Sequence, residues 1–118
     1  MGTSYVFAGL VVRDRDKAAG WYARLIGRPA DMLPNQAEAA WQLAGSASLY
    51  LLADKNRAGR GVAAIVVDDL DAELARIARN GIGPGAMEDY PGTGRKCVIT
   101  DPDGNEVSLI ELSATDSG

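Results

Sequence analysis

The amino-acid sequence predicts an α+β fold built from two tandem βαβββ modules within a single domain. The chain has 118 residues, which is enough for one domain. A pattern of strand, Asp-capped helix and hairpin occurs twice, at a spacing typical of internal repeats. We expect a first module at about 4–54, a linker at about 54–60, a second module at about 61–112 and a frayed tail at 113–118.

Each module is expected to begin with a buried strand. Leu10–Val12 and Ile65–Val67 are apolar, largely β-branched runs, and β-branched residues favour strands. Asp14 and Asp69 follow these runs, and an Asp side chain can accept hydrogen bonds from the free N–H groups at the start of a helix. The two runs therefore predict equivalent strand-to-helix transitions.

Helical patterns follow both capping residues. Residues 17–26 and 70–79 place their apolar side chains at helical spacing, so that each helix has one face for packing. Gly27 and Gly81 stand where a left-handed residue ends many helices. We therefore expect one amphipathic helix in each module.

A hairpin is predicted after each helix. The turn sequence Asp-Pro-Asp-Gly at 101–104 is typical of tight turns, because Pro fixes φ and Gly adapts to the last position. The Pro- and Gly-containing stretches 29–34 and 84–94 each have room for one more short strand. The predicted hairpin strands are residues 38–43 with 48–52, and 95–100 with 106–112.

Charge and composition exclude several classes of partner. Twelve basic residues against 16 acidic ones give a formal charge of -4, without the basic surplus that nucleic-acid binding requires. No apolar run approaches the roughly 20 residues of a membrane helix, and Met1–Val6 lacks a signal-peptide pattern. Cys97 is the only cysteine, so that no internal disulfide forms and a cytoplasmic location is expected.

Several of these motifs together resemble the vicinal-oxygen-chelate superfamily, which contains glyoxalases, bleomycin-resistance proteins and dioxygenases. The resemblance is carried by the aromatic pair Trp21-Tyr22, by Gly27, by residues 101–105 (Asp-Pro-Asp-Gly-Asn) and by residues 110–112 (Ile-Glu-Leu). It implies that each module curls into a half-barrel and that the halves enclose one cavity. It also implies a homodimer.

The family's metal site is expected to be absent. Its first-strand ligand is typically a His seven residues before the capping Asp, and these positions hold Phe7 and Val62; the chain has no His at all. The last-strand ligand is usually a Glu, and Glu111 fits that context, with Tyr50, or Leu52 after a shift of two, as its first-module counterpart. One carboxylate does not hold a transition metal, so no metal and no cofactor are expected.

Glu111 is the candidate catalytic residue, and two interpretations stay open for it. By strand alternation it shares a side with Val107 and Leu109, which favours a buried carboxylate that pairs with a cationic ligand or acts as a general base. The alternative is a carboxylate at the rim of the strand that is solvated or paired with an Arg.

Other candidates also have two interpretations. Phe7, Trp41 and Tyr50 either stack on a ligand in the cavity or pack in the core. Cys97, near Arg95, is either a reactive or a structural thiol, and Tyr90 lies either at the cavity mouth or on plain surface. The predicted ligand-binding residues are Phe7, Trp41, Tyr50, Leu52, Val62, Tyr90, Arg95, Cys97, Leu109 and Glu111.

The leading functional hypothesis is a non-enzymatic protein that binds a small hydrophobic or cationic organic molecule in a cavity completed by the dimer partner. A second hypothesis is a metal-independent isomerase or lyase with Glu111 as base and Tyr50, Arg95 or backbone amides as oxyanion donors. A metalloenzyme that combines Glu111 with Glu38, Gln42 or Glu88 ranks third.

Overall fold

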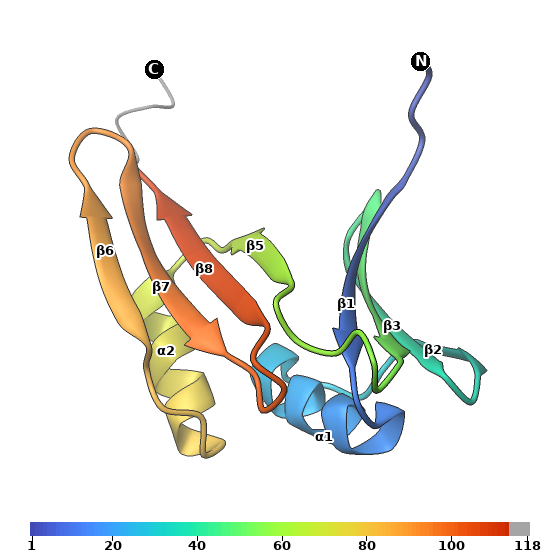
Figure 1. The fold of residues 1–118 in the computed structure, drawn as a ribbon. Coiled ribbons are helices and arrows are strands. Elements are labelled where there is room, and N and C mark those ends of the chain that lie inside the picture. The colour runs from blue at the N-terminus through green and yellow to red at the C-terminus, as the bar shows by residue number, and fades with distance from the viewer. Residues whose placement is uncertain (114–118) are drawn as a thin grey trace.

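The computed structural model describes residues 1–113 and contains eight strands and two helices (Figure 1). In chain order the elements are β1 (Val6–Val12), α1 (Arg15–Ile26), β2 (Met32–Asn35), β3 (Glu38–Ala44), β4 (Ala47–Ala53), β5 (Val62–Val66), α2 (Leu70–Arg79), β6 (Ala86–Tyr90), β7 (Gly94–Thr100) and β8 (Glu106–Leu112). Neither helix of the described part is long and apolar enough to cross a membrane.

The strands form two four-stranded sheets of the same topology, which confirms the predicted α+β fold of two βαβββ modules. The strand orders are β1-β4-β3-β2 in the first sheet and β5-β8-β7-β6 in the second. In both sheets the first strand of the module pairs in parallel with its last strand, and the other pairs are antiparallel. The short strands expected within 29–34 and 84–94 are β2 and β6.

Both helices begin at the predicted capping residues. The Asp14 carboxylate accepts a hydrogen bond from Lys17 N at 3.1 Å, and the Asp69 carboxylate accepts one from Ala72 N at the same distance. α1 ends at Gly27, whose φ of 101° is in the left-handed region that glycine tolerates. Sequence-based capping rules therefore located both helix starts.

The core lies between each sheet and its helix. Side chains alternate along a strand, so every second residue faces the helix and the residues between them face the opposite side of the sheet. The largest fully buried side chains include Trp41, Tyr22, Leu10, Leu49 and Leu51 in the first module and Leu70, Ile77, Ile99 and Val107 in the second. Each sheet therefore has one face in the core, and its other face is left for other contacts (Figure 1).

A buried polar network joins the two modules. The Asp101 carboxylate accepts hydrogen bonds from Tyr22 Oη at 2.7 Å and from Asn105 Nδ2 at 2.9 Å. Asn105 Nδ2 also donates to Val11 O in β1, and Asn105 Oδ1 accepts from Gly61 N next to β5. The turn between β7 and β8 is thereby attached to α1, to β1 and to the start of the second module.

Tyr22 stays protonated in this network. Burial, and after it the hydrogen bond to Asp101, raise the pKa of the Tyr22 phenol above its usual range. The folded chain therefore keeps this proton at alkaline pH values at which the unfolded chain releases it. Since the unfolded state then binds fewer protons, the free energy of unfolding falls as the pH rises above the usual pKa of tyrosine.

Tyr22→Phe is expected to lower the free energy of unfolding at neutral pH by about 1–3 kcal/mol, because it removes a donor from the buried Asp101 carboxylate. Above about pH 10 the difference in free energy of unfolding between wild type and variant is expected to shrink by about 1.4 kcal/mol per pH unit. The reason is that residue 22 releases a proton on unfolding only in the wild type. Urea unfolding of both proteins at neutral and alkaline pH measures this difference, and a difference that does not change with pH contradicts the assignment.

Candidate functional site

The face of the first sheet that points away from α1 carries a pocket. All four strands of the sheet contribute to it, and its volume is about 390 Å³, within the range of small-molecule sites. This first-sheet pocket is lined by Phe7, Met32, Pro34, Glu38, Ala40 and Tyr50. Most of these side chains are apolar or aromatic, as is typical of sites for organic ligands.

Aromatic rings form one wall of the first-sheet pocket. The ring centroids of Phe7 and Tyr50 are 6.1 Å apart with planes at 75°, and those of Tyr5 and Phe7 are 4.8 Å apart. Phe7 is 53% exposed, so that a large apolar surface there contacts solvent when the pocket is empty. Rings held in this way offer a stacking surface for a planar ligand.

Gly9 makes room for the Tyr50 ring. It is the register partner of Tyr50 across β1 and β4, and a Cβ atom at Gly9 would lie 2.7 Å from Tyr50 Cζ. The ring therefore lies across β1 at the one residue of this strand without a side chain. A glycine inside a strand often marks such a close approach, which was the available sequence signal for Gly9.

Glu38 supplies the only carboxyl group among the side chains that line the first-sheet pocket, and none of the others is basic. Its Oε1 atom accepts a hydrogen bond from Asn35 Nδ2 at 2.6 Å. The sequence suggested Glu38 only as a ligand in the metalloenzyme hypothesis, and it did not single out Met32, Pro34 or Ala40. Their strand positions are clear from alternation, but alternation alone does not tell which face of a sheet is covered by the helix.

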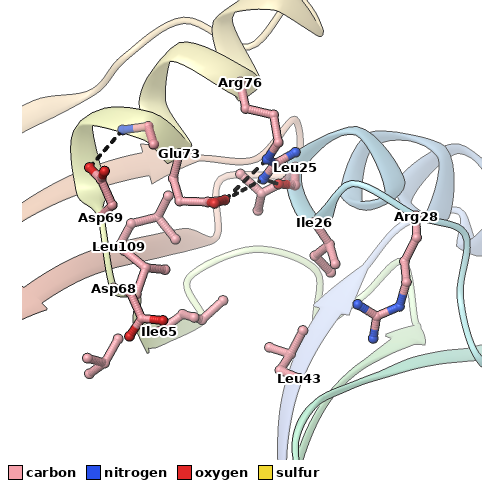
Figure 2. Close-up of a pocket in the computed structure, with 13 residues that line it drawn as sticks. Leu25, Ile26, Arg28, Leu43, Ile65, Asp68, Asp69, Glu73, Arg76 and Leu109 are labelled. Atoms are coloured by element: carbon pink, nitrogen blue, oxygen red, sulfur yellow. Dashed lines mark hydrogen bonds and ion pairs between the residues drawn. The ribbon is translucent and has the colours of Figure 1, made fainter.

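A second cavity of about 390 Å³ lies between the modules (Figure 2). Its apolar floor includes Ile26, Leu43 and Ile65, and charged groups surround it. Figure 2 shows Arg76 reaching from α2 to α1, where it donates to Leu25 O; its guanidinium also pairs at 2.9 Å with Glu73 of its own helix. Arg76 and Glu73 are thus engaged with each other, Arg28 pairs with Asp31, and Asp69 caps α2, so most of the charged groups here already have partners within the protein. This cavity therefore offers a ligand less than the first-sheet pocket does.

Glu111 does not line the first-sheet pocket and lies on the other sheet, away from its aromatic rings. Its Oε1 atom accepts a hydrogen bond from Leu70 N at 2.8 Å, at the start of α2, and its Oε2 atom is 3.4 Å from Arg95 Nε. Arg95 also pairs with Asp71 at 2.9 Å, and this hydrogen bond lowers the pKa of the Asp71 carboxyl. Glu111 thus stands on the helix side of its sheet, with both oxygens engaged.

The registers correct the pairing of Glu111 with Tyr50. In the first sheet Tyr50 lies opposite Gly9, and in the second Ser108 lies opposite Ala64, which precedes its capping Asp by the same number of residues as Gly9 does. Ser108, and not Glu111, is therefore the equivalent of Tyr50. The turn of the second hairpin is longer than that of the first, which displaces the last strand relative to the repeat.

The positions that correspond to the family's metal ligands do not fit a metal. On the face opposite the helices, the first strands carry Phe7 and Val62, and the last strands carry Tyr50 and Ser108 at equivalent positions. These side chains lack the imidazole and carboxylate donors that a divalent transition metal prefers. Within residues 1–113, no group of three or more His, Cys, Asp or Glu residues is arranged to hold a metal ion.

Three of the predicted ligand-binding residues are core residues. Trp41 and Cys97 are fully buried and Leu109 nearly so. Trp41 packs near Tyr22, with ring centroids 6.2 Å apart, and its indole N–H donates to Arg28 O at 2.9 Å. Trp41 faces the helix because it alternates with Ala40, which lines the first-sheet pocket.

The side chains of the other predicted residues are at least partly accessible, but they do not form one cluster. Leu52 follows Tyr50 on the pocket side of β4, whereas Val62 is 72% exposed on β5 of the second sheet. Tyr90 lies on β6, where its hydroxyl donates to Glu88 and its ring is 5.7 Å from the Lys96 ammonium. Of the ten residues, the structure brings Phe7 and Tyr50 together in the first-sheet pocket.

Comparisons with known proteins agree on one family. The model of the Glyoxalase/Bleomycin resistance protein/Dioxygenase superfamily matches residues 4–109. A glyoxalase/bleomycin resistance protein from Catenulispora acidiphila DSM 44928 is 33% identical, with 94% of this chain and 100% of that chain covered and a TM-score of 0.88. Among curated proteins, none matches the sequence.

Two further solved structures are similar. TnmS3, an antibiotic binding protein from Streptomyces sp. CB03234, is 25% identical, with 96% of this chain and 99% of that chain covered and a TM-score of 0.77. A bleomycin-binding protein solved in complex with bleomycin is 24% identical, with 94% and 100% covered and the same TM-score of 0.77. At this identity the second likeness concerns the fold alone.

Glu111→Ala is expected to lower the free energy of unfolding by about 1–2 kcal/mol, because it leaves the buried N–H of Leu70 without an acceptor. Urea unfolding measures this loss. Asp68→Asn, which removes an exposed carboxylate nearby, is the matched control and should change stability by less than about 0.5 kcal/mol. An unchanged stability for Glu111→Ala would contradict a helix-capping role.

Proposed function

Since this chain belongs to the Glyoxalase/Bleomycin resistance protein/Dioxygenase superfamily, we propose that it binds a small hydrophobic organic molecule in the first-sheet pocket. The family resemblance found in the sequence is thereby confirmed. The proposal includes a second copy of the chain, whose sheet completes the cavity over the pocket, and a cytoplasmic location.

The aromatic wall of the first-sheet pocket is the observation that carries this proposal. Phe7 and Tyr50 hold apolar surface open to solvent, at a free-energy cost that a ligand relieves by covering it. The volume of about 390 Å³ suits a ligand of two or three fused rings. The similar TnmS3 is an antibiotic binding protein, which supports binding rather than turnover as the activity.

A general-base enzyme receives no comparable support from the geometry. The carboxylate of Glu111, the proposed base, faces α2 and is occupied by Leu70 N and Arg95. Within the first-sheet pocket, the Tyr50 hydroxyl and the Glu38 carboxylate are the only polar side-chain groups. A binding function requires no more than these groups supply.

The second sheet offers the surface that a partner copy would use. Val62 and Val66 on β5 are 72% and 59% exposed and lie on the face opposite α2. Figure 1 shows the two sheets leaning apart, with no helix over the face of the second sheet opposite α2 or over the face of the first sheet opposite α1. Packing the second sheet of one copy over the first sheet of another would bury both apolar faces and enclose the pocket.

Gly9→Val is expected to reduce the affinity for the neutral planar dye Nile red at least tenfold. The new side chain displaces the Tyr50 ring from β1 into the pocket. Nile red fluorescence titrations measure the affinity. Gly45→Ala is the matched control, because a Cβ atom there meets nothing within 4 Å, and it should bind as the wild type does. Equal affinity of Gly9→Val and wild type would place the dye elsewhere.

Val62→Asp is expected to convert a homodimer into a monomer, because it places a charge within the apolar face that the partner would cover. Sedimentation velocity at micromolar concentration measures the state. Leu33→Asp is the control: Leu33 is also exposed but lies on the other side of its sheet from Met32 and Pro34. A monomeric wild type at concentrations that saturate with ligand would rule out the completed cavity.

A further inference from the structure

We propose that Glu38 makes the first-sheet pocket selective for organic cations, so that its ligand is a planar hydrophobic molecule carrying a protonated amine or a guanidinium group. This inference rests on the proposed binding function and adds the charge of the ligand. The sequence pointed to Glu111 for that role, and Glu111 lies on the other side of the other sheet.

The Glu38 carboxylate is held in place from one side. Asn35 Oδ1 accepts a hydrogen bond from Ala37 N at 2.8 Å, which fixes the orientation of the Asn35 amide. The amide Nδ2 then donates to Glu38 Oε1 at 2.6 Å. This chain of contacts at the turn between β2 and β3 positions the carboxylate and leaves its second oxygen, Oε2, for an incoming donor.

The charge of Glu38 has no counterpart in the described part of the chain. The ion pairs among residues 1–113 engage carboxylates on both modules, and none of them includes Glu38. A half-buried carboxylate beside apolar walls gains from a cation more than a fully solvated one does, because less water screens the charge. A ligand cation supplies the missing partner.

The neighbours of Glu38 define the rest of the ligand. Phe7 and Tyr50 offer ring surfaces to a flat aromatic body, and Met32 and Pro34 add apolar contact from the edge strand. The face of an aromatic ring also attracts cations. Anionic compounds are disfavoured, because no basic side chain lines the pocket and Glu38 adds an acidic one.

Three tricyclic or near-isosteric probes test the charge preference: the cation 9-aminoacridine, neutral acridine and the anion 9-anthracenecarboxylate, titrated at neutral pH by calorimetry. The wild type is expected to bind the cation about tenfold more tightly than acridine, and the anion most weakly. Glu38→Gln keeps an amide oxygen for the contact with Asn35 and should reduce cation affinity about tenfold, while acridine affinity stays within twofold. Asp68→Asn, the matched loss of a distant exposed carboxylate, should retain the preference.

The outcomes separate this inference from the binding function on which it rests. If the cation and acridine bind equally well to the wild type, or if Glu38→Gln weakens both alike, Glu38 selectivity is wrong and the hydrophobic site stands. If no probe binds, or if Gly9→Val leaves all three affinities unchanged, the first-sheet pocket is not the site and both proposals fail. Increasing the salt concentration should weaken the binding of the cation and leave the binding of acridine unchanged.

Discussion

Asp101 imposes the constraint on which the arrangement of the two modules depends. A carboxylate that is only 4% exposed must have its hydrogen bonds satisfied, and this one accepts from the Tyr22 hydroxyl and from backbone and side-chain groups of its own turn. Asn105 in that turn extends the network to Val11 and Gly61. The requirement to satisfy one buried carboxyl group therefore ties the second hairpin to the first helix, to β1 and to the residue that precedes β5.

The same junction includes β1, the strand that carries Phe7 of the first-sheet pocket. The ladder between β1 and β4 places Gly9 opposite Tyr50, and Asn105 Nδ2 adds a hydrogen bond to Val11 O near the end of β1. The missing side chain at Gly9 lets the Tyr50 ring lie against the backbone of β1, with its centroid 6.1 Å from that of Phe7. This wall of the pocket therefore depends on the small residue at Gly9 and on the pairing of β1 with β4, and β1 is also tied to the turn of the second hairpin.

Much of the fold followed from local patterns, because capping, turn chemistry and apolar spacing act over a few residues. Asp14 and Asp69 marked the helix starts, and the repeat marked the two modules. The site was harder, since alternation separates the two faces of a strand without telling which one a helix covers. Trp41, a predicted ligand-binding residue, therefore lies in the core, whereas Glu38, on the other face of the same strand, lines the pocket.

Glu111 shows the second limit, which is register. A longer turn in the second hairpin shifts β8 relative to the repeat. As a result Glu111 faces α2, and Ser108, on the other face of β8, is the residue equivalent to Tyr50. The physical consequence reaches beyond one residue. The helix-facing sides of both sheets bury the core, whereas the opposite sides carry the first-sheet pocket and the exposed Val62 and Val66. Beside the aromatic wall of the first-sheet pocket the carboxylate is that of Glu38 on β3, which takes part in no ion pair among residues 1–113, whereas both oxygens of Glu111 on β8 are engaged on the helix side of the second sheet.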